Sequence, residues 1–147
     1  MSKRYYLAGP MSGYPQFNFP LFHEVAGELR AKGYEIISPA EMDSPAVQQA
    51  AMKSADGQLD TQGKIAGETW GELLARDVQL VADKIDGIVF LPHWYDSRGA
   101  LLEATTGLLA GVKKPFEFRQ WDGQDAAPVS PVSVAAMLHS GLLGMIK

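Results

Sequence analysis

The stretch Ile85–Leu91, Ile-Asp-Gly-Ile-Val-Phe-Leu, is the most hydrophobic strand that the chain predicts, and Pro92 ends it. A short apolar run bounded by a turn residue is typical of a buried strand. The segment before it opens with Thr69-Trp70-Gly71-Glu72, which matches a capping box and predicts the start of a helix. After the strand, Ser97 is a predicted N-cap of a second helix. The centre of the chain is therefore predicted to run helix, strand, helix.

The same alternation extends toward both ends of the chain. Strands are predicted at Arg4–Ala8, Tyr34–Ser38 and Phe116–Phe118. Between the first two strands, apolar residues recur at helical spacing and predict a helix. Gly33 is predicted to end this helix, because glycine is common directly after a helix. Strands that alternate with helices indicate an α/β domain with a mainly parallel sheet. In such a sheet, ligands bind beyond the carboxyl ends of the strands.

Two segments lack this regular pattern. Residues 42–67 are rich in small and polar residues, with a short helix predicted over Pro45–Lys53, and they form either a solvated insertion or a lid. Residues 120–131 have the composition of a linker, after which Ser130-Pro131 opens a last helix. We therefore expect a domain over residues 1–118, with residues 119–147 forming a linker and a C-terminal helix that packs on the domain or on a neighbouring subunit.

The composition narrows the class of partner. The 147 residues contain 46% hydrophobic and 20% charged residues, ordinary values for one globular domain. The net charge of −4 argues against a nucleic-acid polymer, whose binding needs clustered Lys and Arg. A single phosphate remains compatible with this charge, because backbone N–H groups can hold it. A small-molecule partner is therefore expected.

No cofactor is expected, and no metal. The chain has no cysteine, which excludes disulfides and a cysteine nucleophile, and the spacing of its three histidines, His23, His93 and His139, suggests no metal site. The N-terminal residues lack the apolar run of a signal peptide, and no stretch approaches the ~20 apolar residues of a membrane span. We expect a cytoplasmic protein with no membrane partner.

Asp77 lies on the apolar stripe of its predicted helix. Leu73 and Leu74 precede it by four and three residues, and Val81 follows it by four. Because burying a charge is costly unless it is paired, this carboxylate is a candidate functional group. A carboxylate at the helix edge, bonded to backbone or to an arginine elsewhere in the fold, would give the same pattern.

Glu103 is the second candidate. The apolar stripe of its helix predicts which residues are buried. They are Leu101, Thr105, Leu108, Leu109 and Val112. Glu103 points away from that side, onto a face of small residues that includes Gly99 and Gly107. It lies about one turn inside a helix that opens at the ligand edge of the sheet. A solvent-facing glutamate on a surface helix is the alternative.

Two loops at that edge are candidate phosphate sites. Ser97, Arg98 and Gly99 supply free N–H groups at a helix N-terminus, although an ordinary capped helix start would have the same residues. Gly9, Ser12 and Gly13 follow the first strand. His93 is placed to contact a substrate, and Trp94 would stack on a base, cover the core or form a subunit contact.

Several fragments resemble the nucleoside 2-deoxyribosyltransferase-like family by their order and spacing, from residue 4 to about 118: Tyr5–Pro10, Ala75–Asp77, Asp86–Phe90, Ser97–Glu103 and Lys114–Pro115. The resemblance implies a three-layer, flavodoxin-like or Rossmann-like fold. It also implies a homo-oligomer in which a neighbouring subunit completes each site. In this family a glutamate attacks the anomeric carbon of deoxyribose, so the resemblance implies that Glu103 is the nucleophile and Asp77 the assisting carboxylate.

One departure from the family pattern bears on the substrate. Transferases that act on free nucleosides have an aspartate six residues before the glutamate, where this chain has Ser97. The related 2′-deoxynucleoside 5′-monophosphate N-hydrolases have a serine there, which binds the phosphate. The resemblance therefore implies a monophosphate held by Ser97, Arg98 and Gly99, with Ser12 and Gly13 helping.

The expected function is hydrolysis of the base–deoxyribose bond of a 2′-deoxynucleoside 5′-monophosphate through a covalent glycosyl-enzyme on Glu103. Such retaining chemistry needs a second carboxyl group about 5 Å away, the place expected for Asp77. Three alternatives stay open: base exchange between nucleosides, a nucleotide-binding module without turnover, and a structural role in an assembly through the C-terminal helix.

Overall fold

The computed structural model describes residues 2–146 and contains a five-stranded sheet in the order β2-β1-β5-β6-β7. Four strands run parallel: β1 (Arg4–Ala8), β2 (Glu35–Ile37), β5 (Gly87–Phe90) and β6 (Glu117–Trp121). The edge strand β7 (Ala126–Val129) pairs antiparallel with β6. The predicted α/β class with a mainly parallel sheet is confirmed.

The strand β5, which includes most of the hydrophobic stretch at 85–91, lies in the middle of the sheet. All four of its residues are buried, and Tyr5–Ala8 of β1 pair in register with Gly87–Phe90. Gly87 is required there, because a Cβ would lie 2.6 Å from the carbonyl oxygen of Glu117. The strand order reverses between β1 and β5, and in open α/β sheets the crevice at such a point is where ligands bind.

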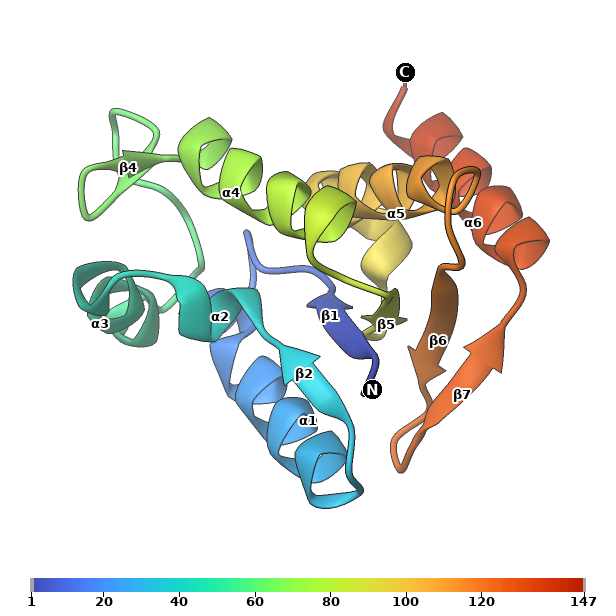
Figure 1. Ribbon diagram of the computed structural model, residues 1–147. Coiled ribbons are helices and arrows are strands. Elements are labelled where there is room, and N and C mark those ends of the chain that lie inside the picture. The colour runs from blue at the N-terminus through green and yellow to red at the C-terminus, as the bar shows by residue number, and fades with distance from the viewer. Residues whose placement is uncertain (1, 147) are drawn as a thin grey trace.

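Helices cover both faces of the sheet and make the predicted three layers (Figure 1). On one face lies α1 (Phe19–Ala31), whose layer continues past β2 in α2 (Pro39–Met42) and α3 (Pro45–Lys53). On the other face lie α4 (Trp70–Asp83), α5 (Arg98–Ala110) and α6 (Pro131–Met145). Each layer has its own apolar core, because alternate residues of the strands point to opposite faces. Within residues 2–146, no helix is long and apolar enough to cross a membrane.

The irregular segment at 42–67 is more ordered than its composition suggests. The predicted helix over Pro45–Lys53 is confirmed as α3, and Ser44 caps it by accepting the N–H of Val47. A small antiparallel hairpin follows, made of β3 (Lys64–Ile65) and β4 (Glu68–Thr69). Strands of two residues are too short to give a periodic signal, so the sequence did not predict them.

The predicted linker at 120–131 is wrong for most of its length. Residues 117–129 form the β6–β7 hairpin, and the carboxylate of Asp122 accepts the N–H groups of Gln124 and Asp125 in its turn. Gly123 takes a φ of 100°, which favours glycine. The last helix is confirmed as α6, which packs against α5, so residues 119–147 continue the same domain as far as the structure describes them.

The predicted buried side of α5 is partly wrong. Leu109 and Val112 are 66% and 75% exposed, whereas Glu103 and the small residues beside it are buried. The reason is close packing: a Cβ at Gly107 would lie 2.8 Å from the Phe116 ring. The small residues let α5 approach the sheet, and Glu103 points inward with them.

Candidate active site

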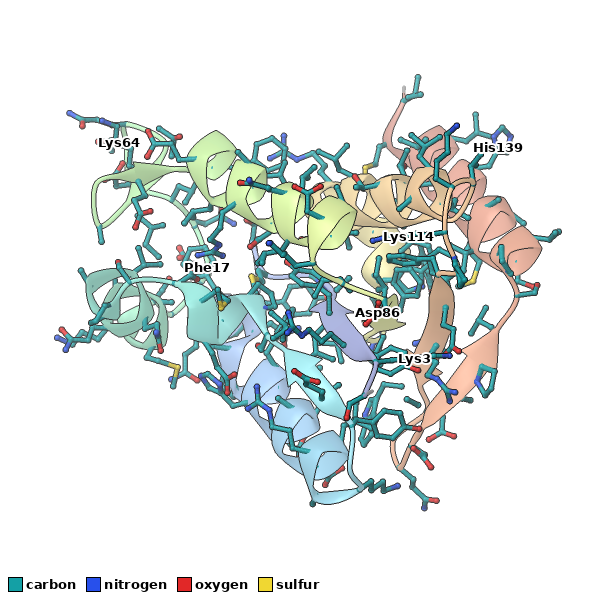
Figure 2. The ribbon with its side chains drawn as sticks, in the orientation of Figure 1. Lys3, Phe17, Lys64, Asp86, Lys114 and His139 are labelled. Atoms are coloured by element: carbon teal, nitrogen blue, oxygen red, sulfur yellow. The ribbon has the colours of Figure 1, made fainter. Side chains whose placement is uncertain are left out.

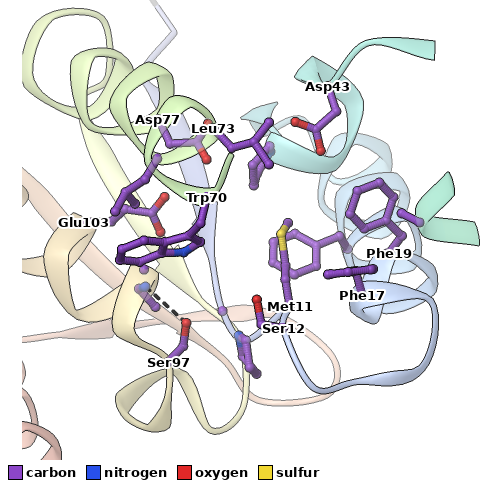
Figure 3. A pocket seen from close by; sticks show the side chains of 18 of the residues that line it. Met11, Ser12, Phe17, Phe19, Asp43, Trp70, Leu73, Asp77, Ser97 and Glu103 are labelled. Atoms are coloured by element: carbon purple, nitrogen blue, oxygen red, sulfur yellow. Dashed lines mark hydrogen bonds between the residues drawn. The ribbon is translucent and has the colours of Figure 1, made fainter. Parts of the chain in front are cut away.

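A cavity of about 230 Å³ opens at the carboxyl ends of β1 and β5, between the two helical layers (Figure 3). This is the place that the strand order indicates for a ligand. Its lining includes most of the residues that the sequence proposes: Gly9, Ser12, Asp77, Ser97, Arg98, Gly99 and Glu103. Leu59 and, in β3, Ile65 close part of its wall, so residues 42–67 are not a purely solvated insertion.

Two buried carboxyl groups meet the cavity from different helices. Glu103 of α5 is 5% exposed and Asp77 of α4 is 8% exposed, so neither is an ordinary surface carboxylate. The hydroxyl of Tyr6, on β1, donates to Oε2 of Glu103 at 2.5 Å. The sequence did not single out Tyr6, because a tyrosine inside an apolar strand has the pattern of an ordinary core residue.

Burial changes the protonation of this carboxyl pair. It raises the pKa of Glu103 well above its usual value; the charge of Asp77 adds to the rise, and the Tyr6 hydroxyl and Arg76 oppose it. Burial likewise raises the pKa of Asp77 to about 6, against the lowering effect of Arg76. Between about pH 6 and the higher pKa of the pair, the two groups therefore share one proton. Tyr6 stays a neutral donor, because burial and the nearby carboxylates raise its pKa too.

This protonation predicts an effect on stability. A carboxyl group whose pKa is higher in the folded than in the unfolded state costs stability as the pH rises through the folded-state pKa. Glutamine at position 103 cannot ionise and can still accept the Tyr6 hydroxyl. We expect Glu103→Gln to raise the free energy of unfolding by about 1–2 kcal/mol at pH 8 and to have little effect at pH 4. Denaturant titration at both pH values measures this.

The matched control is Glu24→Gln, at an exposed position of α1, which should change the free energy of unfolding at neither pH. A Glu103→Gln protein less stable than wild type at pH 8 would contradict the burial effect.

The N-terminal end of α5 has the properties of an anion site. Ser97 caps the helix by accepting the N–H of Ala100, and the N–H groups of Arg98 and Gly99 bond to no acceptor in residues 2–146. The guanidinium of Arg98 lies 4.5 Å from the ring centre of Trp70, and both residues line the cavity. Free N–H groups, a helix dipole and a cation together favour a phosphate or carboxylate.

Gly9 and Gly13 have structural explanations. A Cβ at Gly9 would lie 2.7 Å from Cβ of Leu91, so glycine lets the end of β1 pack closely on the chain after β5. The N–H of Gly13 donates to the carbonyl of Gly57 at 2.8 Å and is taken up by that bond. The Gly13 N–H is therefore not a free donor for a phosphate, while Ser12 lies on the cavity wall.

His93 and Trp94 do not line the cavity, contrary to the prediction. Trp94 is 1% exposed and stacks on Phe90 with ring centres 4.1 Å apart, in the core beneath α5 and α6. His93 takes a φ of 64° and is exposed. The cause is the short helix η2 (Trp94–Asp96), which turns the indole back under the sheet edge.

A core role for Trp94 predicts a large loss of stability on truncation. Trp94→Ala should lower the free energy of unfolding by about 3–5 kcal/mol, because it leaves a large cavity beside Phe90. Trp70→Ala, at a half-buried cavity position, should lower it much less. Denaturant midpoints of the two variants make the comparison. A Trp94→Ala protein as stable as wild type would return Trp94 to the candidates for ligand binding.

The structure adds residues to the site that the sequence did not single out. Phe17 reaches the cavity from η1 (Pro15–Asn18), where Gln16, Phe17 and Asn18 take φ angles of 54°, 52° and 61°. Asn18 stands at the N-cap of α1, but its side chain donates to the carbonyl of Pro10 instead of capping the helix. Arg76 and Asp43 complete the polar side of the cavity. Three consecutive left-handed residues give no periodic signal in a sequence.

Within residues 2–146, no group of three or more His, Asp or Glu side chains is placed to hold a metal ion. His139, for example, lies on the outer surface of α6, far along the domain from Phe17 (Figure 2).

Comparison with known proteins adds one match. Residues 3–113 match the family described as a domain of unknown function, DUF4406. No curated protein matches the chain. The matched region includes every strand of the parallel part of the sheet except β6, and all the cavity residues named above. Since the match covers more than half of the chain, the protein belongs to the DUF4406 family.

Proposed function

We propose that the protein hydrolyses the N-glycosidic bond of a 2′-deoxynucleoside 5′-monophosphate, with Glu103 as nucleophile and Asp77 as acid and base. The observation that carries the proposal is the pair of buried carboxyl groups, brought to one cavity by two helices, with the Tyr6 hydroxyl on Glu103. A pair of carboxyl groups that differ in protonation, one acting as acid and the other as nucleophile, is the usual equipment for glycoside cleavage. The resemblance to nucleoside 2-deoxyribosyltransferase-like proteins supports the same substrate class.

In the first half of the reaction, a carboxylate oxygen of Glu103 forms a bond to C1′ of deoxyribose. The bond from C1′ to the base nitrogen breaks, and its electron pair stays on the base, which takes the proton of Asp77. Attack requires Glu103 to be ionised, with the shared proton on Asp77. The positive charge that develops at C1′ favours this state, and so does the hydrogen bond from Tyr6.

In the second half, the carboxylate of Asp77 takes a proton from water, whose oxygen bonds to C1′ as the bond to Glu103 breaks. Deoxyribose 5-phosphate leaves, and the pair returns to its starting protonation. If a second free base reached C1′ before water, the product would be a new nucleotide. Hydrolysis and base exchange therefore share the first half and differ only in the acceptor.

In this proposal the substrate phosphate binds at Ser97, Arg98 and Gly99. This position can be tested through substrate specificity. Ser97→Asp keeps a good N-cap but adds a negative charge beside the phosphate. We expect kcat/KM for a deoxynucleoside monophosphate to fall on the order of 100-fold, and that for the free deoxynucleoside to fall less than about threefold. Steady-state kinetics with the two substrates measures the ratio. Equal losses for both substrates would mean that position 97 does not face the phosphate.

The function itself is tested by incubating the protein with each of the four common deoxynucleoside 5′-monophosphates and separating the products by chromatography. The proposal predicts free base and deoxyribose 5-phosphate from at least one of them, and little from the matching ribonucleotide. A second run with an added free base separates hydrolysis from exchange. Tight binding with no base released over hours would instead support a binding module and overturn the proposal.

The proposal includes assembly of the chain into a homo-oligomer, as the family resemblance implies. Apolar side chains on the outer surface of α5 and α6 support it, since Leu109 is 66% exposed and Leu143 is 57% exposed. Light scattering during size-exclusion chromatography measures the mass of the particle. A monomer of 16.0 kDa that is fully active would contradict the need for a neighbouring subunit.

A further inference from the structure

A row of three charged groups joins the two walls of the cavity, and the reaction steps above assign a role to only one of them. Asp43 stands at the C-terminal end of α2 and is 8% exposed. Arg76 of α4 donates from Nη1 to Oδ1 of Asp43 at 2.6 Å. The same guanidinium donates from Nε and Nη2 to Oδ1 of Asp77, at 2.9 and 2.7 Å. One arginine therefore links the carboxylates of both walls, which Figure 3 shows on opposite sides of the cavity.

The contact between Arg76 and Asp77 is not one that a helix makes by itself. Consecutive residues on a helix point about 100° apart, so their side chains do not face each other. Arg76 has to fold back along α4 to reach Asp77. The bond to Asp43, from outside the helix, holds the guanidinium in that folded position.

Asp43 is itself held firmly. Its backbone carbonyl accepts the side-chain amide of Gln48 at 2.7 Å, and α3 begins two residues later. Its carboxylate is buried, which is costly unless the charge is paired. Among residues 2–146, Arg76 is the only cation in a salt bridge with it. The position of the guanidinium is therefore set by a fixed, buried partner.

The geometry distinguishes the two oxygens of Asp77. Both Arg76 donors that reach Asp77 bond to Oδ1, and neither bonds to Oδ2. The Tyr6 hydroxyl also lies close enough to Asp77 to lower the pKa of its carboxyl group. When a carboxyl group carries a proton, cationic donors on one oxygen leave the other oxygen to hold that proton. The arginine thus directs the proton of Asp77 to Oδ2.

We propose that Asp43 is a positioning residue, which acts through Arg76 to orient the carboxyl group of Asp77 so that Oδ2 is the atom that exchanges protons in the cavity. The proton exchange with base and water rests on the proposed function. The orientation is a property of the protein without substrate and can be tested on its own.

Removal of Asp43 should shift the pKa of Asp77 in opposite directions, depending on whether Asp43 positions Arg76 or acts only through its charge. The charged or titratable groups that face Asp77 are Arg76 on α4, Asp43 after α2, Tyr6 on β1 and Glu103 on α5. The charge of Asp43 raises the pKa of Asp77, so a protein that loses only this charge would show a lower pKa at Asp77. If Asp43 holds Arg76, its loss frees the guanidinium toward solvent, and the pKa of Asp77 rises instead.

The experiment is a ¹³C NMR titration of the Asp77 carboxyl carbon in the wild-type protein and three variants. We expect Asp43→Ala to raise the pKa above the wild-type value of about 6. Asp43→Asn should leave it at or below that value, since the amide oxygen still accepts from Arg76. The matched control is Glu41→Ala, which breaks the exposed pair with Arg30 on the same short helix and should change nothing.

A lower pKa of Asp77 in the Asp43→Ala protein would overturn the proposal, and so would an unchanged pKa of Asp77. Should that variant fail to fold, Arg76→Lys replaces it, because an ammonium group lacks the planar fork needed to bridge both carboxylates. The pKa of Asp77 is expected to rise in Arg76→Lys as well, and the absence of this rise would also overturn the proposal.

Activity gives a second readout. In Asp43→Ala, kcat should fall up to about 100-fold while KM changes less than about threefold, and Asp43→Asn should recover most of the loss. Wild-type kcat in Asp43→Ala would overturn the positioning role. A wild-type protein that releases no base would overturn the proposed function instead, and the NMR result on the orientation of Asp77 would stand.

Discussion

Replacement of Glu103 with Gln is expected to reduce the rate of base release on the order of 10⁴-fold or more. Glutamine has nearly the same size and keeps the acceptor for the Tyr6 hydroxyl, but its amide oxygen is a poor nucleophile. The loss should appear in kcat, because Glu103 bonds to C1′ only as the reaction proceeds. Initial rates of free-base formation, measured by chromatography under saturating substrate, give the ratio of variant to wild type.

The interpretation of this variant depends on its fold. The Glu103→Gln protein is expected to be more stable than wild type at pH 8, so loss of activity there cannot come from unfolding. Glu24→Gln, at an exposed position far from the cavity, should keep full activity. A Glu103→Gln protein that releases base at more than about one tenth of the wild-type rate would mean that another group attacks the sugar.

Asp77→Asn is expected to lower kcat by about 10²- to 10⁴-fold, the usual contribution of a general acid and base. Asparagine can still accept a hydrogen bond from Arg76, so the variant keeps the contact between positions 76 and 77. It loses only the group that carries the proton. For a substrate whose leaving group needs no protonation, Asp77→Asn should slow the first half of the reaction much less. Comparison of a natural base with such an activated leaving group measures the acid role directly.

The pH dependence of the same variant tests the shared proton. Wild-type kcat/KM should follow a bell, since below about pH 6 both carboxyl groups are protonated and no nucleophile is present. Above the higher pKa of the pair both are ionised and no acid is present. In Asp77→Asn the alkaline fall should disappear, because the only remaining requirement is an ionised Glu103. An unchanged bell in this variant would exclude Asp77 from proton transfer.

The parts of the fold that the sequence predicted are those with a local signal. Capping residues located α4 and α5, at Thr69 and Ser97, and the apolar stretch at 85–91 located β5. The polar composition of residues 120–131 predicts a linker, whereas the turn at Asp122-Gly123 joins β6 and β7 in a hairpin. In α5 the apolar periodicity predicts a buried side that includes Leu109, whereas small residues such as Gly107 face the sheet.

The candidate site was predictable where a residue broke a pattern and not where it matched one. Asp77 stood out as a charge on an apolar stripe, and it is buried at the cavity together with Glu103. Tyr6 matched the pattern of a core strand, and Arg76 that of an ordinary helix surface. The contact of Arg76 with Asp43 joins residues 33 positions apart, and periodicity within a single helix has no information about such a pair.

The claim on which everything else depends is that Glu103 forms a covalent bond to the sugar. Its most direct test uses a deoxynucleotide with fluorine at C2′, which destabilises positive charge at C1′ and slows breakdown of the intermediate. After acid quenching and proteolysis, mass spectrometry of the peptides locates any adduct. The account predicts a peptide carrying the sugar phosphate on Glu103. An adduct on another residue, or base release that inverts the configuration at C1′, would contradict it.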